Sequence, residues 1–171
     1  MSPVNPIKQR QSMRISVQTE DFDVNSVLAE LRGRCAHVGA VACFLGTVRD
    51  MNEARDVAVL TLEHYPGMTE RALERVATEA KSRWPVAGVT IIHRYGALFP
   101  SDQIVLVAVA SAHRHDALEA CTFMMDFLKT HAPFWKKETD SSGASCWVDA
   151  RESDAVARDR WFADFDPPVA E

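Results

Sequence analysis

The sequence lacks long apolar runs, paired cysteines and an excess of positive charge. Its longest apolar stretches, such as residues 104–110, are far shorter than the roughly 20 residues of a membrane-spanning helix, and its N-terminus has no apolar run typical of a secretory signal. The four cysteines form no CxxC pair, which argues against a zinc site and a disulfide framework. The net charge of −5 argues against a general nucleic-acid binder. We therefore expect a cytoplasmic protein with reduced thiols and no metal site.

Motifs of several common enzyme classes are also missing. The chain has no glycine-rich phosphate loop, no GxSxG nucleophile elbow and no Cys/His pair in a recognisable context. Its 171 residues, 47% of them hydrophobic, are enough to bury the core of one domain. We predict a flexible leader over residues 1–12, a single domain over 13–161 and a flexible acidic tail over 162–171.

Capping residues and hydrophobic periodicity predict about three helices. The first follows Asp23 as N-cap, the second is capped by Thr69 and ends before Pro85, and the third begins at Asp116 and ends before Pro133. The stripe expected to be buried in the third helix is Leu118, Cys121, Met125 and Leu128.

β-Branched and alternating apolar segments predict the strands, at residues 38–48, 57–65, 88–94, 103–111, 134–138 and 146–150. With one further strand expected before the first helix, the element order is β-α-β-β-α-β-β-α-β-β; with its hairpins, this order favours an α+β fold with a mostly antiparallel sheet over a doubly wound parallel one.

Cationic side chains gather in three places of this acidic chain: Arg49, His113-Arg114-His115, and Lys129 with Lys136-Lys137. The second group lies at a predicted helix N-terminus, where free N–H groups, the helix dipole and a guanidinium all favour a phosphate or carboxylate. The alternative is that Arg114 forms a surface ion pair and the histidines are solvated.

Lys129 and Lys136 flank Pro133, which prevents the helix from continuing and allows Lys136 to fold back toward Lys129. Two ammonium groups held close lower each other's pKa, so one of them could act as a nucleophile or move protons near neutral pH. The alternative for Lys129 is that it only complements the helix dipole.

The two ends of the third predicted helix are too far apart to serve one small ligand. From Asp116 to Lys129 the helix rises roughly 20 Å. If both groups serve one pocket, we expect that pocket to be shared across a symmetric dimer.

Five segments carry a specific resemblance: GTVR (46–49), LEHYPGMT (62–69), SAHR (111–114), MDFLKTHAPFWKK (125–137) and WVDARESD (147–154). In these the chain resembles the large, catalytic subunits of molybdopterin synthase, the MoaE family. The resemblance implies an α/β-hammerhead-type α+β fold and a homodimer that binds two small ubiquitin-like subunits in a heterotetramer. It also implies sulfur transfer from the small subunit's C-terminal Gly-Gly thiocarboxylate to cyclic pyranopterin monophosphate (precursor Z), which forms the dithiolene of molybdopterin, without a cofactor.

The resemblance also implies roles for individual residues. Lys129 and Lys136 match the two lysines to which a catalytic role is assigned in this family, and Arg151 matches a further basic residue near the pocket. The substrate-binding positions that it implies are Thr47, Val48, Arg49, His113, Arg114, Lys129, Lys136, Lys137 and Glu138.

The sequence leaves two alternatives open. One is a non-catalytic dimeric module that binds a ubiquitin-like tail or an anionic ligand. The other is a phosphate-ester hydrolase that uses the same basic pocket, although the sequence offers it no evident nucleophile or metal site.

Overall fold

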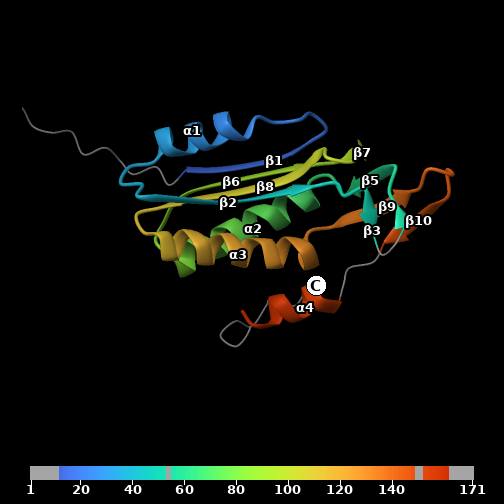
Figure 1. Ribbon diagram of the computed structural model, residues 1–171. Helices are drawn as coiled ribbons and strands as arrows, with labels where there is room; N and C mark the ends of the chain where they lie inside the picture. Colours follow the sequence, from blue (N-terminus) through green and yellow to red (C-terminus); the bar gives the residue numbers. More distant parts are fainter. Residues whose placement is uncertain (1–11, 53–54, 149–151, 162–171) are drawn as a thin grey trace, which may run out of the picture.

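The computed structural model describes residues 12–52, 55–148 and 152–161, which form two four-stranded sheets, a two-stranded hairpin and four helices (Figure 1). The strands are β1 (Ser12–Gln18), β2 (Ala40–Thr47), β3 (Met51–Asn52), β4 (Arg55–Asp56), β5 (Val59–His64), β6 (Val86–Arg94), β7 (Gly96–Leu98), β8 (Gln103–Ser111), β9 (Phe134–Thr139) and β10 (Ser145–Val148). The helices are α1 (Val24–Arg34), α2 (Met68–Arg83), α3 (Arg114–His131) and α4 (Glu152–Asp159). The α+β, mostly antiparallel fold predicted from the sequence is thereby confirmed.

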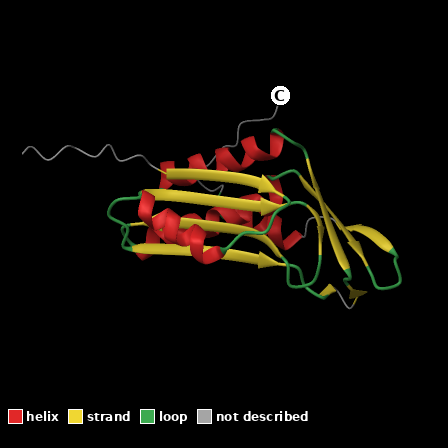
Figure 2. Ribbon diagram, turned by 90° about the horizontal axis from the view of Figure 1, so that it is seen from above, coloured by secondary structure: helices red, strands yellow, loops and turns green. Residues whose placement is uncertain are grey.

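The larger sheet has the order β1-β6-β8-β2 and is covered on both faces (Figures 1 and 2). β1 runs parallel to β6, and the other pairs are antiparallel. Alternate side chains of β8 point to opposite faces: Leu106 and Ala108 pack toward α1, whereas Val107 and Val109 join the main core with α2 and α3. Because both faces are buried, β8 is apolar along most of its length.

The smaller sheet, of order β10-β9-β5-β7, lies beyond one end of the larger sheet (Figure 2). All of its pairs are antiparallel, and its inner face contributes Leu60, Leu62 and Leu98 to a second apolar cluster. β3 and β4 form a separate two-stranded hairpin. This end of the molecule is built from strand ends and loops that carry five of the predicted site residues: Thr47, Val48, Arg49, Lys136 and Glu138.

Two predicted helix starts differ in outcome. Asp23 is the N-cap of α1, and its carboxylate accepts the Ser26 N–H at 2.7 Å, as expected. Thr69 as the cap of α2 is wrong, because the cap is Gly67, whose φ of +79° suits a residue without a Cβ. Thr69 lies inside the helix, where its hydroxyl donates to the Tyr65 carbonyl at 3.0 Å.

The third helix begins two residues before the predicted Asp116. His113 is extended, its carbonyl accepts the Ala117 N–H at 3.3 Å, and Asp116 is therefore in the first turn of α3. The predicted end before Pro133 is confirmed. Leu118 is 57% exposed, so its place in the buried stripe was wrong: α3 packs against both the sheet and α2, and it buries a face shifted toward Ala117 and Met124.

The fourth helix, α4, is additional to the roughly three that were predicted, and it packs against α3. Trp161, which follows it, meets the rings of Trp84 and Phe123 at centroid distances of 5.7 and 5.5 Å, and its indole N–H donates to Asp126 at 2.8 Å. Ser12, placed in the predicted leader, begins β1, whereas the rest of the leader and the tail lie outside the described residues. In the part of the chain that is described, no helix is long and apolar enough to cross a membrane.

Candidate active site

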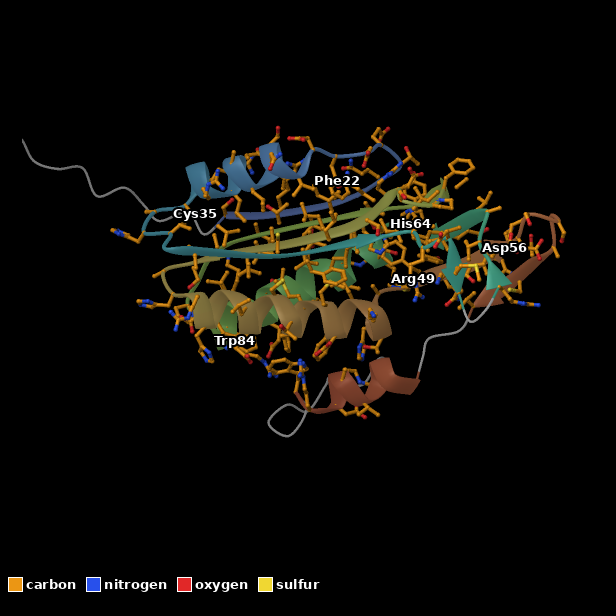
Figure 3. All side chains as sticks on the ribbon, in the orientation of Figure 1. Phe22, Cys35, Arg49, Asp56, His64 and Trp84 are labelled. Atoms are coloured by element: carbon orange, nitrogen blue, oxygen red, sulfur yellow. The ribbon has the colours of Figure 1, made fainter. Side chains whose placement is uncertain are left out.

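A polar pocket forms where the end of β2, the β3–β4 hairpin and β9 meet (Figure 3 labels Arg49 there). The alternation of β9 places Lys136 and Glu138 on its inner face. The residues that line the pocket are Thr47, Val48, Arg49, Asn52, Val57, Leu60, Ile104, Lys136 and Glu138. The structure therefore brings together five predicted site residues from separate segments: Thr47, Val48, Arg49, Lys136 and Glu138.

Hydrogen bonds link the charged groups of this pocket. Lys136 Nζ lies 2.7 Å from Glu138 Oε1, and Asn52 Nδ2 donates to both carboxylate oxygens of Glu138, at 3.1 and 2.9 Å. Arg49 donates through one Nη to Asn52 Oδ1 at 3.1 Å. Two cations are thus connected to one carboxylate, with an amide between Arg49 and Glu138.

Glu138 is kept ionised by these neighbours. Burial by itself raises the pKa of its carboxyl, but the hydrogen bonds from Lys136 and Asn52 and the charges of Lys136 and Arg49 outweigh it, and the pKa falls below its usual value. The Glu138 side chain is 11% exposed and that of Lys136 is 34% exposed. In this ion pair the Glu138 carboxylate is therefore the more buried group, and the Lys136 ammonium is the group nearer to solvent.

The loop that carries Arg49 is held by backbone contacts. A register shift between Gly46 and Thr47 ends the regular pairing of β2 with β8. Val48 then donates its N–H to the Asp102 carbonyl and accepts the Ser101 N–H, both at 2.9 Å. The Val48 side chain is buried in the apolar cluster under the small sheet. Val48 thus fixes the wall from which Arg49 extends.

Lys137 points to the opposite face of β9. Its ammonium lies 5.5 Å from the centroid of the Trp147 ring, on the outer side of the small sheet. Trp135 is on the same side, and both indoles are about half exposed. The structure does not bring Lys137 into the pocket that holds Lys136.

Lys129 and the His113–Arg114 pair occupy the two ends of α3. Lys129 is in the last turn, and the backbone turns extended at Ala132 before β9 begins at Phe134. His113 and Arg114 are exposed at the first turn, about 22 Å from Lys129 along the axis. Within one chain, neither end of α3 lines the pocket around Lys136. Arg151 lies outside the described residues.

Asn52 is the site residue that sequence reasoning missed. It is only 8% exposed, although it lies in a short polar segment that gives no periodic signal. Its partner Glu138 is 86 positions further along the chain. No local pattern could have indicated this contact.

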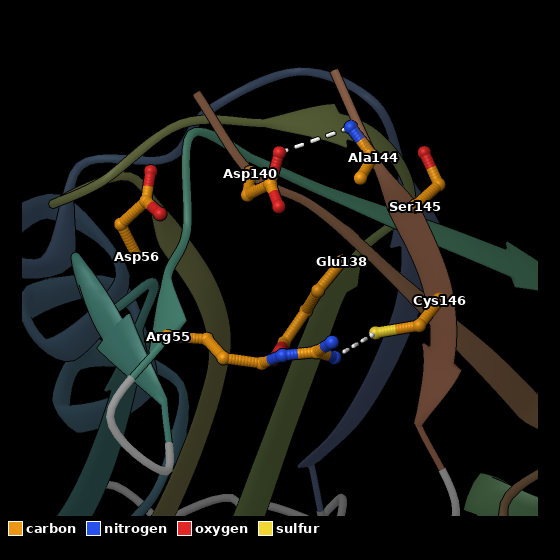
Figure 4. A pocket seen from close by; sticks show the side chains of 7 residues that line it. All are labelled: Arg55, Asp56, Glu138, Asp140, Ala144, Ser145 and Cys146. Atoms are coloured by element: carbon orange, nitrogen blue, oxygen red, sulfur yellow. Dashed lines mark hydrogen bonds between the residues drawn. The ribbon is translucent and has the colours of Figure 1, made fainter. Parts of the chain in front are cut away.

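A second hollow adjoins the first and shares Glu138 as a lining residue (Figure 4). Figure 4 shows the Arg55 side chain reaching past Glu138 toward Cys146, where Arg55 Nη1 lies 3.5 Å from the thiol sulfur. Asp56 and Asp140 also line this hollow. Glu138 thus borders both hollows, one lined by Arg49 and the other by Arg55.

Comparison with known proteins gives consistent matches. The MoaE protein family model matches residues 17–131. The chain is 54% identical over 147 residues to a molybdopterin synthase catalytic subunit of Ralstonia nicotianae, covering 86% of this chain and 83% of that one. It is 50% identical over 149 residues to the subunit of the same name from Pseudomonas aeruginosa, covering 87% and 99%.

Two solved structures agree with these matches. A molybdopterin biosynthesis MoaE protein from Burkholderia ambifaria superposes with a TM-score of 0.75 and 55% identity, covering 87% of this chain and 97% of that one. Molybdopterin synthase from Staphylococcus aureus gives a TM-score of 0.71 at 31% identity, covering 82% and 98%. With the family model and close relatives both spanning most of the described fold, this chain belongs to the MoaE protein family.

Proposed function

We propose that the chain is the catalytic subunit of a cytoplasmic molybdopterin synthase. It transfers sulfur from the C-terminal thiocarboxylate of a small ubiquitin-like subunit to cyclic pyranopterin monophosphate (precursor Z), and so builds the dithiolene of molybdopterin. The observation that carries this proposal is the pocket in which Arg49 and Lys136 are drawn together around Glu138 in a chain of net charge −5.

The chemistry of the reaction suits these side chains. The thiocarboxylate and the cyclic phosphate are both anions, and a further anionic oxygen is released when the phosphate ring opens. The planar guanidinium of Arg49 can donate two parallel hydrogen bonds to the phosphate. Lys136, together with Lys129, stabilises the thiocarboxylate and the oxyanion formed as sulfur is delivered, or supplies a proton to the leaving oxygen. Thr47, Val48 and Glu138 shape the pocket around these groups.

His113 and Arg114 join the site from a second copy of the chain. They are exposed at the far end of α3 from Lys129, and the rise of the helix prevents both ends from touching one small substrate. A symmetric homodimer brings the first turn of α3 from one copy to the pocket of the other. With one small subunit bound to each copy, the assembly is a heterotetramer.

Mixing two inactive variants tests this shared site. Arg114→Ala and Lys136→Ala chains, each inactive alone, form mixed dimers after subunit exchange, and one of the two sites in each mixed dimer has both native residues. About a quarter of all sites then regain activity. No recovery in verified mixed dimers would show that the two residues serve the same chain's site.

Reconstitution tests the reaction itself. The purified chain, a thiocarboxylated small subunit and precursor Z should yield molybdopterin, and Lys136→Ala should lose product while it still binds the small subunit. A chain that binds the tail but never forms product would instead be a non-catalytic docking module. In that case Lys136→Ala would weaken binding and have no turnover to lose.

A further inference from the structure

Asn52 is a buried amide placed between two groups of opposite charge. It lies on β3 and is 8% exposed, and it contacts Arg49 through its oxygen and Glu138 through its nitrogen. We infer that Asn52 is a positioning residue for sulfur transfer, which orients the Glu138 carboxylate so that Glu138 holds Lys136 in the pocket. The catalytic part of this inference rests on the proposed function.

Hydrogen-bond chemistry explains why an amide suits this position. A guanidinium can only donate and a carboxylate can only accept, so the group between them must accept on one side and donate on the other. Asn52 does both, with Oδ1 at 3.1 Å from an Arg49 Nη and Nδ2 within 3.1 Å of both Glu138 oxygens. An aspartate of the same size would keep the contact with Arg49, but it could not donate to Glu138.

The contacts of Glu138 transmit this orientation to Lys136. A lysine side chain has four rotatable bonds and loses much conformational freedom when it is fixed. The position of its ammonium therefore depends on the 2.7 Å contact with Glu138 Oε1. Because Asn52 bonds both oxygens of that carboxylate, the carboxylate cannot rotate freely about its last bond. Asn52 thus acts on Lys136 without touching it.

The β3–β4 hairpin supplies Asn52 from outside both main sheets. The Val57 N–H donates to the Asp50 carbonyl at 2.8 Å and closes the base of the hairpin. β3 and β4 pair with each other, so the hairpin is an independent element that reaches over the pocket. This explains how a residue outside the recognisable segments becomes part of the site.

Several charged or titratable groups face Glu138 and bear on a test by pH. Lys136 is on its own strand, Arg49 follows β2, Arg55 and Asp56 are on β4, Asp140 follows β9, and Cys146 is on β10. Replacing Asn52 by aspartate leaves all of these in place. It removes two hydrogen bonds to the Glu138 carboxylate and adds a like charge beside it, and both changes favour protonation of Glu138.

The experiment compares Asn52→Asp and Asn52→Ser with the matched control Asn25→Asp, an exposed position on α1. In the free protein, the Glu138 carboxyl is titrated by NMR with ¹³C-labelled glutamate. Its pKa should rise by about one unit or more in Asn52→Asp, by less in Asn52→Ser, and not at all in the control. This measurement needs no substrate.

In the reconstituted complex, sulfur transfer is followed over the same pH range. We expect kcat near neutral pH to fall about tenfold in Asn52→Asp, with binding of the small subunit unchanged and the acid limb of the pH profile moved upward with the Glu138 pKa. An unchanged titration, or an unchanged rate and profile in a folded variant, would overturn the inference. If Asn52→Asp does not fold, Asn52→Ser decides by the same criteria. If the wild-type complex makes no molybdopterin, the proposed function is refuted. The titration still tests the positioning of Glu138 in that case.

Discussion

His93 makes the stability of the fold depend on pH in a way that can be calculated. Its ring stacks on Phe134 with centroids 3.7 Å apart, and its Nδ1 lies 2.8 Å from the Arg94 carbonyl, to which it donates. Burial, with a smaller contribution from the nearby His64, lowers the pKa of His93 from 6.5 to about 4 in the folded protein, against the hydrogen bond to Arg94, which raises it. The imidazole is therefore neutral in the folded protein under conditions where it begins to charge in the unfolded chain.

The sign and size of the effect follow from this difference. Above about pH 7.5 His93 is neutral in both states and the stabilisation is complete. As the pH falls toward 4 the unfolded chain binds a proton that the folded protein excludes, so the free energy of unfolding decreases. The full loss is about 3 kcal/mol, of which about 2 kcal/mol is lost between about pH 7.5 and about pH 5. That is a large fraction of the roughly 5–15 kcal/mol that stabilises a typical domain.

Urea unfolding of the isolated chain at a series of pH values measures this loss. His93→Phe keeps the stacking on Phe134 but cannot be protonated, so its stability should fall by about 2 kcal/mol less than that of the wild type over the same interval. His37→Asn is the matched control: His37 is exposed, and its φ of +56° is one that asparagine tolerates. In this control, the free energy of unfolding should change with pH as it does in the wild type. If the free energy of unfolding falls equally with pH in the wild type and in His93→Phe, the assignment of this acid sensitivity to His93 is refuted.

Two further predictions concern the site and the C-terminal helix. Lys136→Ala should reduce molybdopterin formation in the reconstituted complex about 100-fold or more. The side chain of Lys137 contacts Trp147 on the other face of β9, so the fold-reduction in Lys137→Ala should be at least about tenfold smaller. Equal reductions would contradict the placement of the two lysines on opposite faces. Trp161→Ala should remove the ring that packs on Trp84 and Phe123, together with the hydrogen bond to Asp126. Amide hydrogen exchange should then accelerate in α4, while β6 and β8 keep their protection. Uniform acceleration would show that Trp161 supports the whole domain.

The fold was predictable where local chemistry decides it. Asp23 begins α1 because its carboxylate binds a free N–H, and Pro133 ends α3 because proline cannot continue a helix. The short strands β3, β4 and β7 gave no signal, since two or three residues carry no periodicity. Leu118 was misplaced because the packing of α3 against α2 and the sheet, rather than the hydrophobicity of single residues, sets the buried face.

The site was predictable to the extent that its residues lie in recognisable segments. Arg49, Lys136 and Glu138 were identified in that way, and the pairing of β9 with β5 then explains which of the adjacent lysines faces inward. Asn52 could not be identified, because its role exists only once the hairpin folds over a strand far away in the sequence. Such contacts depend on tertiary structure, which no window of sequence contains.

The charge of the pocket gives an independent reason to expect a second copy of the chain. Its charged lining residues are Arg49, Lys136 and Glu138, two cations and one anion, so the pocket has one net positive charge. A cyclic phosphate and a thiocarboxylate bring about one negative charge each, and ring opening adds to that of the phosphate. The charged residues that line this pocket therefore do not balance its ligands by themselves, and further cations would complete the balance. Lys129, at the end of α3 of the same chain, supplies one such cation, and the His113–Arg114 pair of a second copy is the group that dimerisation would add, which the mixed-dimer experiment tests.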